Sequence, residues 1–324
     1  MTEYVLEPAA AAFAAAVAAT QPVYELTPSA ARAALEDTQS GRVAKPDVGS
    51  TWKTVEAGGV QVQIRIVKPV DVQGMLPVLL YLHGGGWMLG SANTHDRLVR
   101  ELSVGAHAAV VFVDYDRAPE APYPVALEQA YAAARWIQRE GAGAGLDAGR
   151  VAVAGDSAGG NLAAALALLG RRRGDVTFIH QSLYYPVTDA SQDTQSYRDF
   201  ADGPYLTAKA MASFWDAYLP DTARRDAIFV SPVKAGAAEL AGLPETFVVV
   251  DEYDVLRDEG ESYARNLTAA GVRCTSVRFN ATVHDFMMLN SLRETAAATA
   301  AITQAIDVLR RALWPSRKGE LSDG

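Results

Sequence analysis

Residues 155–159 read Gly-Asp-Ser-Ala-Gly, and the central Ser157 is a candidate nucleophile. An apolar run at 151–154 precedes this segment, and a helix-forming stretch at 161–169 follows it. A G-x-S-x-G sequence between a strand and a helix is typical of the nucleophile elbow, a sharp turn that exposes the serine hydroxyl above a sheet. Many loops contain Gly and Ser, but here the strand and the helix that this turn needs are both predicted. The segment therefore predicts a serine hydrolase.

A serine hydroxyl reacts only when a base takes its proton, and the base needs an acid that orients it. With this elbow the acid and then the histidine follow the serine along the chain, so His180 and His284 qualify as the base. His180 lies within the apolar run 178–185, whereas His284 lies between the last predicted strand and the last predicted helix. We therefore predict that His284 is the base, and we expect His95 and His107 to face solvent from a surface helix.

The acid has to lie between Ser157 and His284, on the loop after the penultimate strand. The acidic residues within or near that loop are Asp251, Glu252, Asp254 and Asp258. Spacing alone does not choose among them. Asp156 is adjacent to the serine, but on a sharp turn its side chain points away from the hydroxyl, so we expect it to steady the elbow.

A glycine-rich segment, residues 83–87, reads His-Gly-Gly-Gly-Trp and follows the predicted strand 78–82. Acyl transfer needs backbone N–H groups aimed at the developing oxyanion, and flexible glycines after a strand can supply them. Such turns also occur as ordinary loops, but the accompanying elbow favours the functional interpretation. We predict an oxyanion hole built from the amides of Gly84, Gly85 and Ala158.

The elements that must position these residues alternate along the chain. Two segments separated by glycines, 51–56 and 60–67, predict a β-hairpin. The alternation that follows predicts a mostly parallel central sheet with helices on both faces. The predicted strands are 78–82, 110–113, 150–154, 178–185, 246–250 and 272–279, and the predicted helices are 93–107, 125–140, 161–169 and 289–313.

Roughly 60 residues separate two of these strands, far more than a connection normally needs, so we expect an inserted lid over 190–230. Within it a helix from Thr207 to about Leu219 carries apolar side chains at near-helical spacing. The predicted substrate pocket consists of Trp87, Met211, Phe214 and Trp215, with plain packing as the alternative role for this helix. We expect residues 1–50 to form an N-terminal helical cap segment, and 51–189 with 231–324 to form the core.

Composition narrows the class of protein. The chain has 324 residues, of which 49% are hydrophobic and 21% charged, as in soluble globular proteins. Its formal net charge of −9 opposes nonspecific binding to nucleic acid, and no apolar window has the character of a membrane span. The Ala-rich start carries Glu3 and Glu7 instead of the basic residues of a secretory leader, so a cytoplasmic protein is expected.

Three segments together resemble the bacterial hormone-sensitive-lipase-like esterases of the α/β-hydrolase fold. They are His-Gly-Gly-Gly at 83–86, Gly-Asp-Ser-Ala-Gly-Gly-Asn at 155–161 and Asp-Val-Leu-Arg-Asp-Glu at 254–259. The similarity spans roughly residues 50–312. It implies Asp254 as the acid and short acyl chains, rather than long triglycerides, as the substrates.

The sequence departs from the pattern of this family in a few places. Asp254 is followed by Val255 instead of proline, and His284 is followed by Asp285 instead of glycine. The family's arginine is displaced by one position, at Arg117. We expect Asp285 to be a solvated residue at a helix start; the alternative is a carboxylate that raises the pKa of His284.

These residues predict hydrolysis of a carboxylic ester. Ser157 attacks the acyl carbon, His284 transfers the proton, Asp254 orients His284, and water releases the acyl group. No metal and no organic cofactor is implied, the expected partner is a small ester, and a homodimer is left open. An amidase or formamidase with the same residues is the nearest alternative. A noncatalytic receptor is a second one, against which the presence of all three residues argues.

Overall fold

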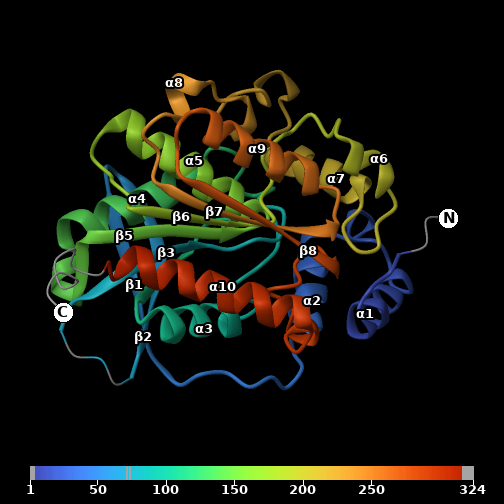
Figure 1. The fold of residues 1–324 in the computed structure, drawn as a ribbon, viewed down its shortest axis with the longest axis horizontal. Coiled ribbons are helices and arrows are strands. Elements are labelled where there is room, and N and C mark those ends of the chain that lie inside the picture. The colour runs from blue at the N-terminus through green and yellow to red at the C-terminus, as the bar shows by residue number, and fades with distance from the viewer. Residues whose placement is uncertain (1–3, 71, 73, 316–324) are drawn as a thin grey trace, which may run out of the picture.

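The computed structural model describes residues 4–70, 72 and 74–315 (Figure 1). In this part of the chain an eight-stranded sheet has the order β1-β2-β4-β3-β5-β6-β7-β8. The predicted hairpin is present, and its second strand also pairs antiparallel with β4, while all later neighbours are parallel. The strands are β1 (Val48–Ala57), β2 (Val60–Pro69), β3 (Leu76–Leu82), β4 (Ala109–Asp114), β5 (Leu146–Asp156), β6 (His180–Tyr184), β7 (Glu245–Tyr253) and β8 (Cys274–Val283).

Helices cover both faces of this sheet, as predicted. Figure 1 shows α3 and α10 on one face and α5 and α9 on the other, and α4 packs beside α5. The helices are α1 (Pro8–Ala18), α2 (Pro28–Thr38), α3 (Asp96–Ala106), α4 (Val125–Glu140), α5 (Ala158–Arg173), α6 (Gln195–Asp199), α7 (Ala208–Tyr218), α8 (Ala237–Leu240), α9 (Arg257–Ala269) and α10 (Ala296–Leu313). Among the described helices, none has both the length and the apolar character required to cross a membrane.

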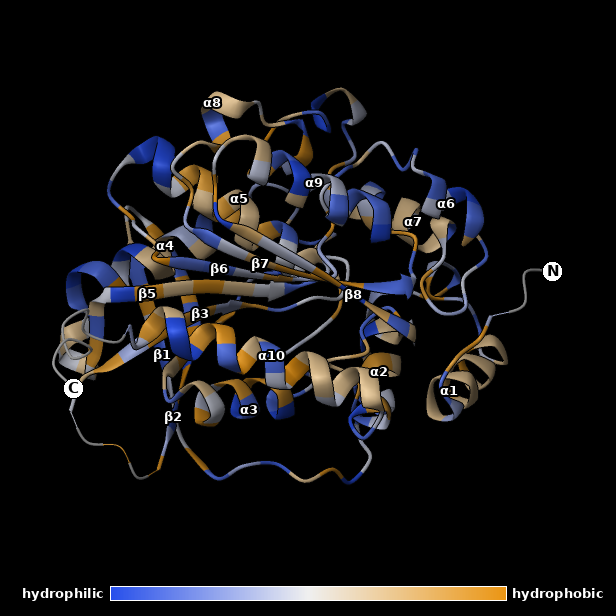
Figure 2. Ribbon diagram, viewed as in Figure 1, coloured by the Kyte–Doolittle hydropathy of each residue, from blue (hydrophilic) through white to orange (hydrophobic). Residues whose placement is uncertain are grey.

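The central strands are buried because they are covered on both faces, and β3 is a continuous apolar run. Every residue of β3 and β6 is buried, whereas most of β1, at the sheet edge, is exposed. Figure 2 shows hydrophobic residues along β5, in the middle of the sheet, and hydrophilic residues on the outer turns of the surrounding helices. β5 and β7, which precede Ser157 and Asp254, are therefore largely buried, whereas β8, which precedes His284, is the other edge strand and is buried only at its end.

Two of the long helices on the sheet, α9 and α10, differ most from the prediction. α10 begins at Ala296 and not near residue 289, because Thr295 caps it by accepting a hydrogen bond from the amide of Ala298. α9 occupies 257–269, where no helix was predicted, and its apolar positions recur at helical spacing among charged residues. The periodic signal of α9 was present but weak, since only a narrow stripe of the helix is apolar.

The insertion leaves and re-enters the core at neighbouring points. The amide of Val233 donates to the carbonyl of Thr188 over 3.1 Å. The side chain of Asn161, in α5, donates to the carbonyls of Val187 at 3.0 Å and Val230 at 2.8 Å. A long segment can therefore be inserted here without disturbing the sheet.

The N-terminal segment lies against both the insertion and the core. The ring of Phe13, in α1, packs at 5.0 Å from that of Tyr205, in the insertion. On the core side, the carboxylate of Glu7 accepts hydrogen bonds from the amides of Ala296 at 2.8 Å and Ala297 at 2.9 Å, in the first turn of α10. The amide of Glu7 donates to the carbonyl of Ala281, in β8. Residues near the N-terminus thus touch elements on both sides of His284.

Candidate active site

Ser157 stands in the sharp turn between β5 and α5, with φ 53° and ψ −120°. This is a conformation that residues with a side chain seldom adopt, and it persists only when the surroundings enforce it. Two glycines enforce it by close packing. A Cβ atom at Gly155 would lie 2.2 Å from the carbonyl oxygen of Gly159, and one at Gly159 would lie 2.0 Å from that of Leu82. The elbow therefore requires glycine at both positions, because a side chain would collide with the neighbouring backbone.

Ser157, His284 and Asp254 are connected by two hydrogen bonds in series. His284 Nε2 lies 2.9 Å from Ser157 Oγ, and His284 Nδ1 lies 2.7 Å from Asp254 Oδ2. The other oxygen of Asp254 accepts from the amide of Leu256 at 2.9 Å. All three side chains are buried. Because β5, β7 and β8 run parallel, their carboxyl ends bring these residues to the same edge of the sheet.

The other candidates for the base and the acid lie elsewhere. His180 is buried within β6, where its ring bonds to Ser182 at 2.8 Å and burial lowers its pKa to about 4. Glu252 accepts from the amide of Ala281, and Asp258 accepts from the amide of Ser196. Of the four acidic residues that spacing left open, only Asp254 bonds to His284 in the described structure.

Asp285 is buried, so the expectation of a solvated residue is wrong. Its side chain lies 3.5 Å from His284 Nε2, and burial raises its pKa to about 6. Burial by itself would disfavour a charged imidazole at His284. The negative charges of Asp254 and then Asp285 outweigh it and raise the pKa of His284 to about 10. The alternative role for Asp285, a carboxylate that raises the pKa of His284, is therefore the one that the structure supports.

Asp156 connects the elbow to the glycine-rich segment and to the start of α3. Its carboxylate accepts from the hydroxyl of Tyr81 at 2.7 Å, the amide of Gly84 at 3.1 Å and the ring of His95 at 3.1 Å. Burial opposes the charge on Asp156, but the neighbouring His95 outweighs it and lowers the pKa of Asp156. In return Asp156 raises the pKa of His95 against the effect of burial. The two form a buried, hydrogen-bonded pair in which each side chain favours the charged form of the other.

The expectation that His95 faces solvent is therefore wrong, while His107 is exposed as expected. His95 directly precedes α3, and its side chain turns inward to a charge that the sequence does not place there. A histidine near a helix start is usually solvated. It is buried here because its ring has a hydrogen-bond partner inside the protein. In this case the partner is more than sixty residues away along the chain.

The glycine-rich segment offers a different set of free amides from the predicted one. The amide of Gly84 is engaged by Asp156, and a Cβ atom at Gly84 would lie 2.3 Å from the Oδ2 atom of this aspartate. Among the described residues, the amides of Gly85, Gly86 and Ala158 are not engaged in a hydrogen bond. Gly86 thus replaces Gly84 as a candidate donor. Sequence reasoning located the segment, but it could not tell which of its amides already had a partner.

The predicted pocket residues surround this segment from the side of α7. Trp87 stacks on Tyr218 with ring centres 4.3 Å apart, and Trp215 lies 4.5 Å from Trp87. Both tryptophans are fully buried; for Trp215, in α7, this agrees with the packing alternative, whereas Trp87 stays a prediction as a pocket residue. Phe214 covers the glycines more closely, because a Cβ atom at Gly86 would lie 2.3 Å from its ring. Phe214 and the buried Met211 stay predictions as pocket residues.

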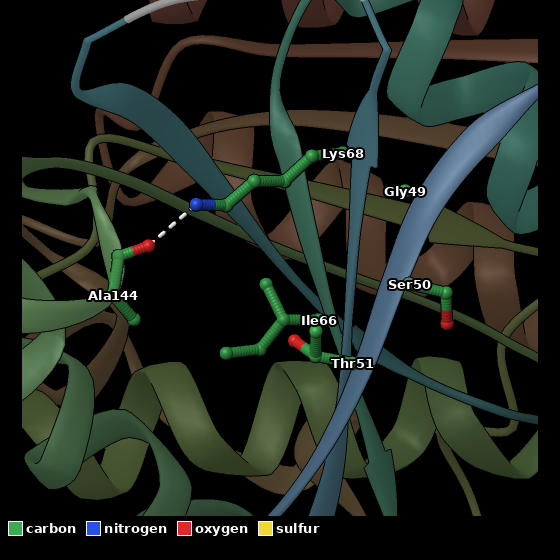
Figure 3. A pocket seen from close by; sticks show the side chains of 6 residues that line it. All are labelled: Gly49, Ser50, Thr51, Ile66, Lys68 and Ala144. Atoms are coloured by element: carbon green, nitrogen blue, oxygen red, sulfur yellow. Dashed lines mark hydrogen bonds between the residues drawn. The ribbon is translucent and has the colours of Figure 1, made fainter.

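A cavity of about 240 Å³ lies far from these residues, between β1, β2 and Ala144 (Figure 3). Lys68 closes one side through a hydrogen bond to the carbonyl of Ala144. Ala144 precedes β5, whereas Ser157 follows it, so the cavity and the nucleophile lie at opposite ends of this strand. The described residues that line it include neither a histidine nor a carboxylate, and Lys68 is the charged one among them.

Within the described residues, one cluster of acidic and histidine side chains is compact enough for a cation. It consists of Asp251, Asp254 and His284, whose donor atoms lie within 4.8 Å of one another. His284 Nδ1 and Asp254 Oδ2 are already bonded to each other at 2.7 Å. The pair is thus arranged to share a proton, and we assign no metal to it.

The sheet order and the strained serine turn define an α/β hydrolase, and comparisons with known proteins agree. A sequence profile described as the alpha/beta hydrolase fold matches residues 79–288. Carboxylesterase NlhH of Mycobacterium tuberculosis is 39% identical over 285 residues, 87% of this chain and 89% of that protein. The chain belongs to the α/β-hydrolase fold family, in which it is one of the hormone-sensitive-lipase-like esterases.

Two further relatives are similar over most of their length. An ethyl acetate hydrolase of Pseudomonas putida is 34% identical over 281 residues, which cover 85% of this chain and 88% of that protein. The crystal structure of a thermostable esterase from Pseudomonas putida ECU1011 has a TM-score of 0.95 and 44% identity. That similarity covers 98% of this chain and all 100% of the other, so the insertion and the N-terminal segment are included in it.

Proposed function

We propose that this protein hydrolyses carboxylic esters with Ser157 as nucleophile, His284 as base and Asp254 as the acid that orients the base. The observation that carries the proposal is the pair of bonds in series, 2.9 Å and 2.7 Å long, that joins the three side chains. This is the geometry in which an imidazole accepts the serine proton while a carboxylate stabilises the imidazolium that results.

The reaction has two halves with an acyl-enzyme between them. Ser157 Oγ attacks the acyl carbon as its proton moves to His284 Nε2, and the amides of Gly85, Gly86 and Ala158 donate to the oxyanion. The tetrahedral intermediate collapses when His284 returns the proton to the leaving alcohol. Water then attacks the acyl-enzyme and gives its proton to His284, and the acid leaves as Ser157 recovers the proton.

We further propose that the N-terminal segment and residues 190–230 form a cap that limits the acyl group to short chains. Two observations support this proposal. Phe214 lies directly against Gly86, and the side chain of Ser157 is buried, so little depth is left above the nucleophile. The relative from Pseudomonas putida that is named an ethyl acetate hydrolase also fits a short acyl group. The cytoplasmic location stays a prediction, and a homodimer stays open.

A fluorophosphonate probe tests the nucleophile directly. We expect the wild-type protein to be labelled and the Ser157→Ala variant to lose both the label and about a thousandfold or more of the esterase activity. An unlabelled, inactive wild-type protein that is folded by circular dichroism would favour the receptor alternative.

A matched panel of p-nitrophenyl esters and anilides tests the substrate class. We expect acetate and butyrate esters to have a higher kcat/KM than decanoate esters, and the esters to be turned over faster than the anilides. Faster cleavage of anilides would move the protein to the amidase alternative, and faster cleavage of long esters would refute the cap proposal.

A further inference from the structure

Asp251 is a fully buried acid that the reaction as described does not use. It lies near the end of β7, three residues before Asp254, and its side chain has no exposed surface. Neither of its carboxyl oxygens accepts a hydrogen bond from a donor in the described residues. An ionised carboxylate without a donor is very costly to bury, and buried carboxylates normally accept several hydrogen bonds. The side chain must therefore be satisfied in another way.

The surroundings of Asp251 are crowded with titratable groups. An oxygen atom of Asp251, an oxygen atom of Asp254 and a nitrogen of His284 lie within 4.8 Å of one another. Tyr185, after β6, and Asp285, after β8, also face it closely enough to influence its charge. Two carboxylates this close in a dry site cannot both be ionised, so one of them holds a proton.

We propose that Asp251 keeps its proton and donates it in a hydrogen bond to Asp254, and that it is thereby a positioning residue for the carboxylate that orients His284. This inference rests on the catalytic roles proposed above. Asp254 then accepts three hydrogen bonds, from Asp251, from His284 and from the amide of Leu256. Each fixes the carboxylate further, so that its oxygen stays directed at the imidazole.

The electrostatics agree with this arrangement. Burial raises the pKa of Asp251 well above its ordinary value, and the negative charge of Asp254 and a hydrogen bond to it raise it further. Asp254 is the better anion of the two, because it has the amide of Leu256 and the ring of His284 as donors. If Asp251 is neutral, His284 has two neighbouring anions instead of three. The base is then less strongly protonated and accepts the serine proton more readily.

The pH dependence of kcat/KM decides between a protonated and an ionised Asp251. Asn carries no charge, so Asp251→Asn leaves the acidic limb of the profile unchanged if Asp251 is already neutral. If Asp251 is ionised, its removal lowers the apparent pKa of His284 by about one unit or more, which would overturn the proposal. Asp285→Asn is the matched control. We expect this variant to lower the apparent pKa, because the carboxylate of Asp285 is only 3.5 Å from His284 Nε2.

A second pair of variants tests positioning. Asp251→Leu has a similar size but no donor, and we expect it to lower kcat about tenfold to a hundredfold with little change in KM. Asp251→Asn retains an N–H donor and should recover most of that loss. Equal kcat values for the Leu variant and the wild type would overturn the proposal, as would an Asn variant that is no better than the Leu variant.

An infrared measurement keeps the proposal testable even if the Leu variant does not fold. The difference spectrum between the wild type and Asp251→Asn near neutral pH should contain the C=O stretch of a protonated carboxyl group. A carboxylate signal in its place would refute the proposal. This readout does not need turnover, so it separates a failure of the inference from a failure of the proposed esterase function, which would instead show as an inactive, unlabelled wild type.

Discussion

At the scale of single residues, the main feature of the site is a base surrounded by acids. His284 touches Asp254 on one nitrogen and approaches Asp285 with the other, and both raise its pKa above the ordinary value. A protonated imidazole cannot accept a proton from Ser157, so the site is active only in the fraction of molecules whose His284 is neutral. This fraction grows as the pH rises.

The pH profile should therefore be shifted to the alkaline side. The pKa of His284 is raised from about 6.5, the ordinary value for imidazole, so activity is lost as the pH falls through the raised value. We expect kcat/KM to reach half of its maximum between about pH 6.5 and about pH 10, measured by pH-stat titration of a short ester at constant ionic strength. A half-maximum below pH 6.5 would contradict the electrostatic role of Asp285.

The sequence predicts some of these residues and not others, for physical reasons. Ser157 and His284 follow from the elbow and from chain order. Asp254 follows only from the resemblance to a family, because several acids share its loop. The burial of Asp285 could not be predicted, since an acid in a loop is solvated unless the fold covers it. The same holds for the free amide of Gly86, because hydrogen-bond partners are set by tertiary structure.

At the scale of elements, the buried pair of Asp156 and His95 holds three segments together. It joins the elbow, the glycine-rich segment and the start of α3, which converge from separate parts of the chain. Because both side chains are fully buried, removing one leaves the other as an uncompensated charge. The alignment of the glycine-rich segment with the elbow therefore depends on this buried pair.

Replacement of His95 by leucine should destabilise the protein by about 3 to 5 kcal/mol, the usual cost of breaking a buried ion pair. Urea unfolding near pH 6 measures this, and His107→Asn, at an exposed histidine with a positive φ, should change stability by about 0.5 kcal/mol or less. The effect of His95→Leu should shrink in acid, as Asp156 is protonated below its lowered pKa. It should also shrink in alkali, as His95 loses its proton above its raised pKa. A loss of stability equal to that of the control would contradict the buried pair.

Substitution of Gly86 tests the contact between the glycine-rich segment and α7. Gly86→Ala would place a methyl group within the ring of Phe214, so we expect kcat to fall by about tenfold to a thousandfold while the protein stays folded. Gly59→Ala is the matched control. It has a similar positive φ with nothing within 4 Å, so it should show the backbone strain alone and normal kcat. Equal kcat values for the two variants would mean that the contact has no role in turnover.

At the scale of the whole molecule, the sheet positions the candidate catalytic residues, and in the function proposed above the cap limits the pocket. The order of strands and helices could be predicted, because alternation and apolar runs are local signals. The order of strands in the sheet and the contact between Phe13 and Tyr205 could not, because they depend on pairings between distant segments. α9 was not predicted for a related reason. Its apolar stripe is narrow, and its packing against β7 stabilises the helix.

Truncation of Phe214 should widen the proposed pocket. In Phe214→Ala we expect the ratio of kcat/KM for octanoate over acetate esters to rise by about tenfold, because a removed aromatic ring frees room for several methylene groups. Ser213→Ala, at the neighbouring position of α7, is the control and should leave this ratio unchanged. An unchanged ratio in Phe214→Ala would place the acyl group away from α7.

The hydrogen bonds of Glu7 predict how the protein responds to proteolytic removal of its N-terminal residues. Glu7 is hydrogen-bonded to the main chain of Ala281 and of Ala296, and His284 lies on the span of chain between these two residues. A protease that trims the chain just past Glu7 would remove hydrogen bonds from both ends of that span at once, although the cut is far from Ser157 in the sequence. Removal of the N-terminal residues through Glu7 should therefore lower esterase activity before it unfolds the sheet.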